Sequence, residues 1–224
     1  MTNPSGQPAK KPLSLRERNR IATRDAIAEA AIQLAMLRGI HDVRIEDIAA
    51  EAGVSTRTFS NYFSSKYEAL TCRHAQRMHH AAVALRDQPA DKPLWSAIAD
   101  AVLAPWQSSA AGLDTPSPET LAELRLLFCD SALQGEILKD VLNDRNEFAH
   151  AIGDRLGLDG RGLYCRLLSA AVTTVTQVTI DIFHEADPPA PLLPLLREAL
   201  GLLSSAFPIP APETGAAGKS EGKE

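Results

Sequence analysis

Hydrophobic positions along this chain recur at the three- and four-residue spacing of a helix face, in one segment after another. In residues 45–52 isoleucines and alanines form one such face, and Gly53 follows where the helix has to stop. Glycines and prolines mark most of the other breaks. The pattern predicts helices over these ranges: 17–38, 45–51, 55–61, 65–87, 93–108, 118–129, 134–156, 161–185 and 191–206. The sequence therefore predicts an all-α protein.

One stretch, AVTTVTQVTI at residues 171–180, favours a strand by local propensity because so many of its residues are β-branched. From Leu168 to Phe183, however, apolar positions recur at helical steps, and a lone strand in a helical chain has no partner. We keep the prediction of a helix there, with tertiary packing supplying what propensity does not.

Residues 44–66 combine a short helix, a glycine turn and a second short helix with an unusual set of side chains. Ser55 is placed to cap the second helix, and Val54, Phe59 and Phe63 fall on its apolar side. The outward positions carry hydrogen-bonding groups that suit base edges and phosphates: Thr56, Arg57, Ser60 and Asn61. We therefore predict a helix-turn-helix whose second helix recognises DNA.

The segment resembles the DNA-binding half of the tetracycline-repressor (TetR) family of regulators. The resemblance runs from residue 18 to residue 70, through Ile48-Ala49, Ala52-Gly53-Val54-Ser55, Phe59, Phe63 and Lys66, with Thr23-Arg24, Ile27, Ala30-Ala31, Leu34 and Gly39 upstream. It implies phosphate contacts by Thr58, Tyr62 and Lys66. It also implies a second helical domain whose interior binds a small molecule. The TFSNYF and RLGL segments are similar to a branch with acyl-thioester-like ligands.

Two positions depart from the family pattern. Arg44 stands where a threonine usually caps the second helix, and Ser60 stands where an aromatic residue usually lies near a phosphate. A lost cap costs about 1 kcal/mol, and Asp42 is a candidate to replace it. The predicted DNA-binding set is Arg44, Ser55, Thr56, Arg57, Thr58, Ser60, Asn61, Tyr62 and Lys66.

The distribution of charge supports a DNA-binding N-terminal part. Residues 1–90 hold 13 Lys and Arg against 9 Asp and Glu, a net charge of +4, whereas the rest hold 10 against 19, a net charge of −9. We expect a disordered basic arm over residues 1–14 that contacts phosphates or the minor groove, or is simply solvated. The other predicted divisions are a helix-turn-helix domain over 15–64, an effector-binding and dimerisation domain over 65–207, and a disordered tail over 208–224.

Composition favours a soluble, cytoplasmic protein. Of 224 residues 45% are hydrophobic, and the mean hydropathy is −0.12. No apolar run approaches the roughly 20 residues that a membrane span needs, and the N-terminus lacks an apolar leader segment. We therefore expect no membrane partner. Cys72, Cys129 and Cys165 form no CxxC pair and are expected to be free thiols.

No catalytic motif of the GxSxG, HExxH, GxGxxG or Walker type occurs, so an enzyme carrying a helix-turn-helix is the least favoured class. Cys72, His79 and His80 fall on one predicted helix and suggest a metal or redox sensor as an alternative. Because ligands on a single helix do not converge on an ion, we predict neither a metal site nor a cofactor.

Large apolar residues of the C-terminal part are candidates to line an effector pocket, or to form only a core: Trp95, Trp106, Leu124, Phe128, Phe148, Ile152 and Val172. Apolar stripes on the last two helices predict a homodimer through an intersubunit four-helix bundle, unless both stripes face their own domain. The candidate interface residues are Leu168, Val175, Thr179, Phe183, Leu195 and Leu202.

The sequence therefore favours a transcription regulator, most simply a repressor that a small apolar or amphipathic effector releases from a palindromic operator. Two alternatives stay open. One is a regulator whose effector strengthens DNA binding, and the other is an architectural DNA-binding protein without an effector. Because the predicted helix 65–87 joins the two domains, its tilt is the expected means of moving the DNA-binding heads.

Overall fold

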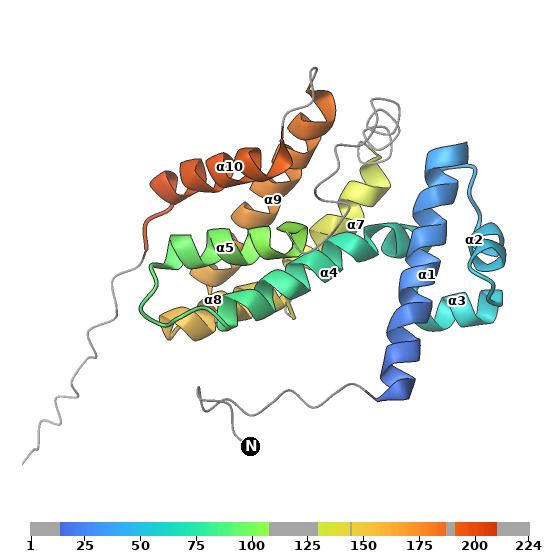
Figure 1. Cartoon of the computed structure of the whole chain (residues 1–224), viewed down its shortest axis with the longest axis horizontal. Helices are drawn as coiled ribbons and strands as arrows, with labels where there is room; N and C mark the ends of the chain where they lie inside the picture. The colour runs from blue at the N-terminus through green and yellow to red at the C-terminus, as the bar shows by residue number, and fades with distance from the viewer. Residues whose placement is uncertain (1–13, 108–129, 144, 187–190, 210–224) are drawn as a thin grey trace, which may run out of the picture. The chain divides into compact units, whose positions relative to one another are not determined.

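A computed structural model describes residues 14–107, 130–143, 145–186 and 191–209 (Figure 1). These residues form helices and no strand, which confirms the predicted all-α class. The helices are α1 (Leu15–Arg38), α2 (Ile45–Glu51), α3 (Thr56–Tyr62), α4 (Lys66–Arg86), α5 (Leu94–Gln107), α7 (Ser131–Leu142), α8 (Glu147–Leu156), α9 (Leu163–Glu185) and α10 (Leu192–Ala206). The helix predicted at 118–129 lies outside the described residues.

The chain forms two compact units. Of the described residues, the first comprises 14–74 and 130–137, and the second comprises 75–107, 138–143, 145–186 and 191–209. The division therefore falls inside two helices, α4 and α7, rather than in a linker. Each unit has a hydrophobic core of its own.

The first unit is a three-helix arrangement extended by the beginning of α4. α1 starts at a capping box in which the Ser14 hydroxyl accepts from the Glu17 amide at 3.2 Å and the Glu17 carboxylate accepts from the Ser14 amide at 3.1 Å. Its buried side packs on α2 and α3 around Ile48, Phe59 and Phe63, which are at most 2% exposed. This core holds α3 against α1 and leaves its opposite side to solvent.

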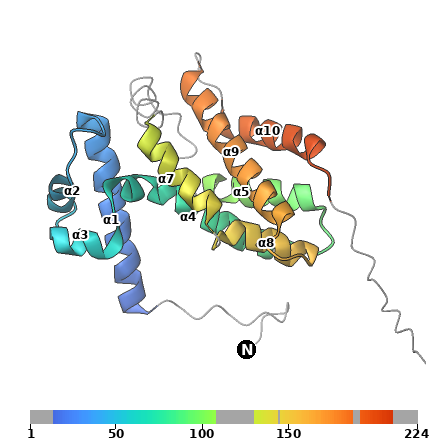
Figure 2. The same ribbon diagram turned by 180° about the vertical axis from the view of Figure 1, so that it is seen from behind.

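The second unit is a bundle in which α9 packs against α8 and α10, and α10 also packs against α5 (Figure 2). Its core includes Leu85, Ile98, Phe148, Ile152 and Val172. α9 includes the β-branched stretch 171–180, so the prediction of a helix there is confirmed. Tertiary packing has overridden a local preference for strand, because α9 buries side chains along its length, from Cys165 to Phe183.

The single helix predicted over 134–156 is wrong, because the chain forms α7 and α8 with a break between them. Asn143 and Asn146 cause the break, since short amide side chains compete with helical hydrogen bonds. The Asn143 side chain accepts from the Arg145 amide at 2.9 Å. The Asn146 side chain caps α8 by accepting from the Ala149 amide at 3.0 Å.

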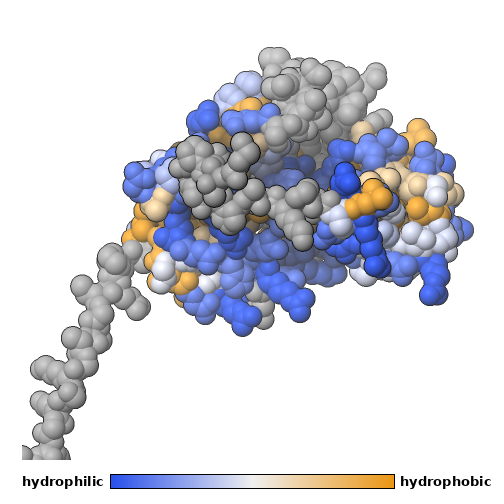
Figure 3. All heavy atoms as spheres, turned by 60° about the horizontal axis from the view of Figure 1, so that its bottom comes forward, coloured by the Kyte–Doolittle hydropathy of each residue, from blue (hydrophilic) through white to orange (hydrophobic). Residues whose placement is uncertain are grey.

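Of the described residues, only Leu163–Phe183 in α9 are long and apolar enough to cross a membrane. The most apolar window of this stretch is 44% buried inside the protein, and the buried core helix of a soluble protein meets the same criteria. The face shown in Figure 3 is mostly hydrophilic, with hydrophobic side chains exposed in small separate groups.

Candidate nucleic-acid interface

The turn before α3 is built by Gly53. Its φ of 67° lies in the left-handed region that favours glycine, and it lets the end of α2 close with two backbone bonds. The Val54 amide donates to the Ala49 carbonyl at 2.9 Å, and the Gly53 amide donates to the Ala50 carbonyl at 3.1 Å. Val54 then packs on the core, so α3 leaves the turn in a fixed direction.

Ser55 caps α3, as predicted, and the helix runs from Thr56 to Tyr62. The Ser55 hydroxyl accepts from the Thr58 amide at 3.0 Å and lies 2.8 Å from the Thr58 hydroxyl. The inner side is anchored by Phe59 and Phe63, whose ring centroids are 5.9 Å apart. The Arg24 guanidinium lies 5.2 Å from the centroid of the Phe63 ring and ties α1 to this anchor.

The outer side of α3 is polar and exposed. Thr56, Arg57, Ser60 and Asn61 are exposed, whereas Thr58 and Tyr62 are half-buried. The Ser60 hydroxyl donates to the Thr56 carbonyl at 3.1 Å, which occupies its proton. Within the described residues the side chains of Arg57 and Asn61 have no hydrogen-bond partner. These two lie four residues apart, on one face of α3, with their donors available to a ligand.

Arg44 precedes α2 and is exposed, but its side chain makes no capping hydrogen bond. The prediction that Asp42 replaces the missing threonine cap is wrong, because among the described residues Asp42 makes no side-chain hydrogen bond; Asp47 makes only the reciprocal bond of a capping box. Its carboxylate accepts from the Arg44 amide at 3.1 Å and lies 4.0 Å from the Arg38 guanidinium. This leaves the Arg44 guanidinium exposed at the start of α2, where a phosphate can meet it.

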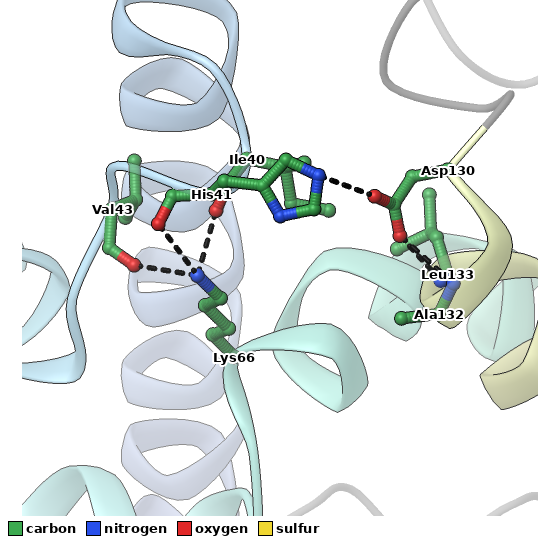
Figure 4. A network of polar contacts seen from close by, with 7 residues as sticks. All are labelled: Ile40, His41, Val43, Lys66, Asp130, Ala132 and Leu133. Carbon is green, nitrogen blue, oxygen red and sulfur yellow. Dashed lines mark hydrogen bonds and ion pairs between the residues drawn. The ribbon is translucent and has the colours of Figure 1, made fainter.

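Lys66 has a structural role that the sequence did not indicate (Figure 4). Its ammonium donates to the carbonyl oxygens of Ile40 at 2.7 Å, Val43 at 2.9 Å and His41 at 3.4 Å. The first residue of α4 is thereby bonded to the connection between α1 and α2. Three donors and three carbonyls satisfy the ammonium within the protein, so its contact with a DNA phosphate stays a prediction.

The same connection contacts the beginning of α7. The His41 imidazole lies 3.2 Å from the Asp130 carboxylate, which is 8% exposed and also accepts from the Ala132 and Leu133 amides (Figure 4). Leu133 is 1% exposed and belongs to the core of the first unit. A helix from the C-terminal half of the sequence is thus part of the DNA-binding unit, which sequence periodicity did not reveal.

The candidate effector residues have different environments. Phe148, Ile152 and Val172 are at most 1% exposed in the core of the second unit, and Trp95 packs on the same cluster. The Trp95 indole donates to the Phe207 carbonyl at 3.3 Å. Trp106 is half-buried, and the Arg77 guanidinium lies 4.3 Å from the centroid of its ring. Leu124 and Phe128 lie outside the described residues.

The candidate dimer-interface residues differ in exposure. Leu168, Thr179 and Phe183 are at most 7% exposed inside their own unit. Val175 and Leu195 are half-buried, and Leu202 is 70% exposed. The exposed apolar residues of α9 lie on another face: Leu163, Leu167, Val178 and Ile182. Periodicity identified the stripe from Leu168 to Phe183 as apolar but did not decide whether it faces its own domain or a second chain.

The alternative of a metal sensor gains no support from the geometry. Cys72 is buried in the first core, and burial raises the pKa of its thiol, which disfavours the thiolate that binds metal. His79 belongs to the second unit, where its Nδ1 lies 2.5 Å from the Glu147 carboxylate. In the part of the chain that the structure describes, no group of three or more His, Cys, Asp or Glu is arranged to hold an ion.

Comparisons with known proteins assign both parts of the chain. The family model described as bacterial regulatory proteins, tetR family, matches residues 27–70, and the model of the MftR C-terminal domain matches residues 92–208. Among solved structures, the fatty acid degradation regulator FadR from Bacillus halodurans is similar, with a TM-score of 0.52 and 18% identity over 86% of this chain and 96% of that chain. A TetR-like transcriptional regulator from Rhodococcus sp. RHA1 has a TM-score of 0.38 and 17% identity, over 87% and 100% of the two chains. No curated protein matches the sequence.

Proposed function

Because the chain belongs to the TetR family of bacterial regulatory proteins, we propose that this transcription regulator is a repressor, released from a palindromic operator by a small apolar or amphipathic effector. Members of the family act by binding DNA, and the chain is not an enzyme. Its DNA-binding domain includes the segment 27–70. We place its action in the cytoplasm, where bacterial DNA lies.

The observation that carries the proposal is the exposed outer side of α3. Arg57 and Asn61 point away from the Phe59 anchor with unengaged donors, and Arg57 pairs well with guanine as Asn61 does with adenine. Each such contact discriminates by about 1–3 kcal/mol against a wrong base. Thr58, Tyr62 and Arg44 flank this surface and serve as phosphate contacts that position the helix.

A single α3 covers too few base pairs to select one site, so we propose a homodimer that binds two half-sites related by two-fold symmetry. The surface proposed for its interface is the exposed α9 stripe, defined as Leu163, Leu167, Val178 and Ile182, together with Leu202 on α10. Four of these five residues are at least half exposed, and Val178 is 49% exposed. Burial of such side chains between two chains stabilises a dimer by roughly 25 cal/mol per Å² of apolar surface.

The second unit is the proposed effector site. Trp95, Phe148 and Val172 bring aromatic and aliphatic surface together in a bundle, which is the chemistry that an apolar chain requires. The resemblance to a branch with acyl-thioester-like ligands supports an amphipathic effector. The name of the Bacillus halodurans regulator points toward the same class of molecule, since it refers to fatty acid degradation.

Two helices connect an effector site in the second unit to the DNA-binding unit. α4 and α7 each begin in the first unit and continue into the second. α4 is held at its start by Lys66, and α7 by buried Leu133 and the Asp130–His41 pair. An effector that shifts either helix therefore displaces the DNA-binding unit and its α3. To move the ratio of released to DNA-binding protein from 1:99 to 99:1, the effector needs a binding preference of about 5.5 kcal/mol for the released state.

Operator affinity tests the proposal. A ligand extracted from the purified protein is added back to stripped protein, and binding to a selected operator is measured by fluorescence anisotropy with and without it. We expect the ligand to weaken binding. Equal affinities would exclude the switch, and tighter binding would show a co-repressor. An architectural protein would bind unrelated sequences equally well, with the same dependence on salt.

A further inference from the structure

The interior face of α9 carries a row of hydroxyl groups in an otherwise apolar core. Ser169, Thr173 and Thr176 follow one another at steps of four and three, so they share one face of the helix. They are 0%, 3% and 4% exposed. We call these three residues the α9 hydroxyl row. Buried hydroxyl groups in proteins are generally hydrogen-bonded, because an unpaired one loses its water without replacement.

Two members of the row are satisfied by protein atoms. The Ser169 hydroxyl donates to the Asn146 side-chain oxygen at 3.1 Å, which links α9 to the cap of α8. The Thr176 hydroxyl donates to the Val172 carbonyl at 2.8 Å, one turn back along the helix. Neither proton is available to a further acceptor.

Thr173 is the exception. Among the buried hydroxyls of the described residues, which also include Thr71 and Thr179, it alone has no hydrogen-bond partner. Thr71, Thr176 and Thr179 all bond to a carbonyl one turn back, so the same option exists for Thr173 but is not taken. Among its described residues, the second unit therefore contains one buried hydroxyl without a hydrogen-bond acceptor, that of Thr173.

We propose that Thr173 is a ligand-binding residue whose hydroxyl donates to an uncharged carbonyl group of the effector. This proposal rests on the effector-binding role proposed for the second unit. The group is uncharged because no Lys, Arg or His in the described chain hydrogen-bonds to any member of the row, and a bare charge is costly to bury. The core around the row is apolar and includes Leu168 and Val172 of α9. The ligand class is an apolar chain that carries an ester, thioester, amide or ketone.

The test uses two probes and three variants of the full-length protein. N-phenyl-1-naphthylamine, an uncharged fluorophore without a carbonyl, reports an apolar site, and 2-undecanone supplies one carbonyl on an apolar chain. Thr173→Val removes the hydroxyl at nearly constant shape, and Thr173→Ser retains it. The matched control is Thr176→Val, which removes a hydroxyl from the same row whose proton is already engaged.

We expect all four proteins to bind the fluorophore equally. The concentration of 2-undecanone that displaces it should rise by about 3- to 10-fold in Thr173→Val, the loss of one hydrogen bond, and stay unchanged in Thr173→Ser and Thr176→Val. Without ligand, the melting temperature of Thr173→Val should equal or exceed that of the parent, because an unpaired donor is removed.

Three results would overturn the proposal. Equal displacement in Thr173→Val and the parent would show that the hydroxyl does not contact the carbonyl, while the effector site itself would stand. Binding of the fluorophore without any displacement by 2-undecanone would exclude the carbonyl class. If neither probe binds the parent protein, this proposal fails as well, and operator release by an extracted ligand still decides the repressor role.

Discussion

α3 and α9 expose sides of opposite polarity. α3 buries Phe59 and exposes Arg57 and Asn61, whereas α9 buries apolar residues together with the hydroxyl row and exposes the apolar stripe from Leu163 to Ile182. A helix with a polar outer side suits the hydrated, charged surface of DNA. A helix with an apolar outer side requires cover from another apolar surface, and its buried hydroxyls suit a polar atom inside. The polarity of each outer face thus indicates a different kind of partner.

The largest expected effect comes from truncating a core residue, and it should be confined to the unit that contains that residue. Phe59→Ala should lower the free energy of unfolding of the first unit by about 3–5 kcal/mol, and Phe148→Ala should do the same to the second. Peptide-resolved thiol labelling measures this, because Cys72 is buried in the first core and Cys165 in the second. Phe59→Ala should accelerate labelling of Cys72 but not of Cys165, and Phe148→Ala the reverse. Equal acceleration of both thiols would show one cooperative body.

The exposed stripe of α9 gives the next largest effect. Val178→Glu places a charge in the proposed intersubunit contact and should raise the dissociation constant of the dimer by about 100-fold. Leu138→Glu on α7 is the matched control, since Leu138 is similarly exposed at 54% but lies outside the stripe. Sedimentation equilibrium measures both. If the Val178→Glu protein stays fully dimeric, the interface lies on another surface.

Substitution of Lys66 distinguishes a structural role within the DNA-binding unit from a contact with a DNA phosphate. Lys66→Met keeps the aliphatic stem but removes the donor to three carbonyls, so the first unit should lose about 1.5–3 kcal/mol of stability. DNA affinity should fall without a change in its salt dependence. A phosphate contact, which the family resemblance implies, would instead reduce the salt slope by about one and leave the melting temperature unchanged.

The smallest expected effect concerns the start of α1. Hydrogen bonds from the Ser14 hydroxyl and then the Ser14 amide lower the pKa of Glu17 below its usual 4.5. Because the pKa is depressed in the folded protein, this stabilisation is present above pH 4.5 and is lost as the pH falls through the lower folded value. The protection of first-turn amides from exchange, taken relative to the intrinsic rate at each pH, should fall over that range, and Ser14→Ala should abolish this change in protection. An unaltered exchange profile in Ser14→Ala would contradict the assignment.

The helix-turn-helix was predictable because its signals are local. Gly53 has the positive φ that its position indicated, Ser55 caps α3, and Phe59 and Phe63 are buried. Each depends on neighbours within one or two turns. The roles of Lys66 and Asp130 were not predictable, since Lys66 bonds to backbone carbonyls 23 to 26 residues away and Asp130 pairs with His41. The sequence does not indicate which backbone carbonyls accept a hydrogen bond from a distant side chain.

The second unit was predictable as helices but not as a site. Periodicity identified the apolar stripe that contains Leu168 and Phe183, but it did not decide that this stripe faces inward, and it did not single out the exposed Leu163 and Ile182. The break between α7 and α8 had a local signal in Asn143 and Asn146, which the longer apolar periodicity outweighed. Thr173 carried no signal, because an unpaired hydroxyl is defined by the absence of a partner in space.

Selection of bound DNA from a random pool, with the parent protein and with Arg57→Ala in parallel, tests the DNA-recognition assignment most directly. The parent should enrich a two-fold symmetric site whose half-sites lie about one helical turn, or a multiple of it, apart. Arg57→Ala should enrich the same spacing but lose preference at one symmetric pair of positions. If Arg57→Ala enriches a site identical to that of the parent, or the parent enriches no symmetric site, α3 does not recognise DNA as we propose.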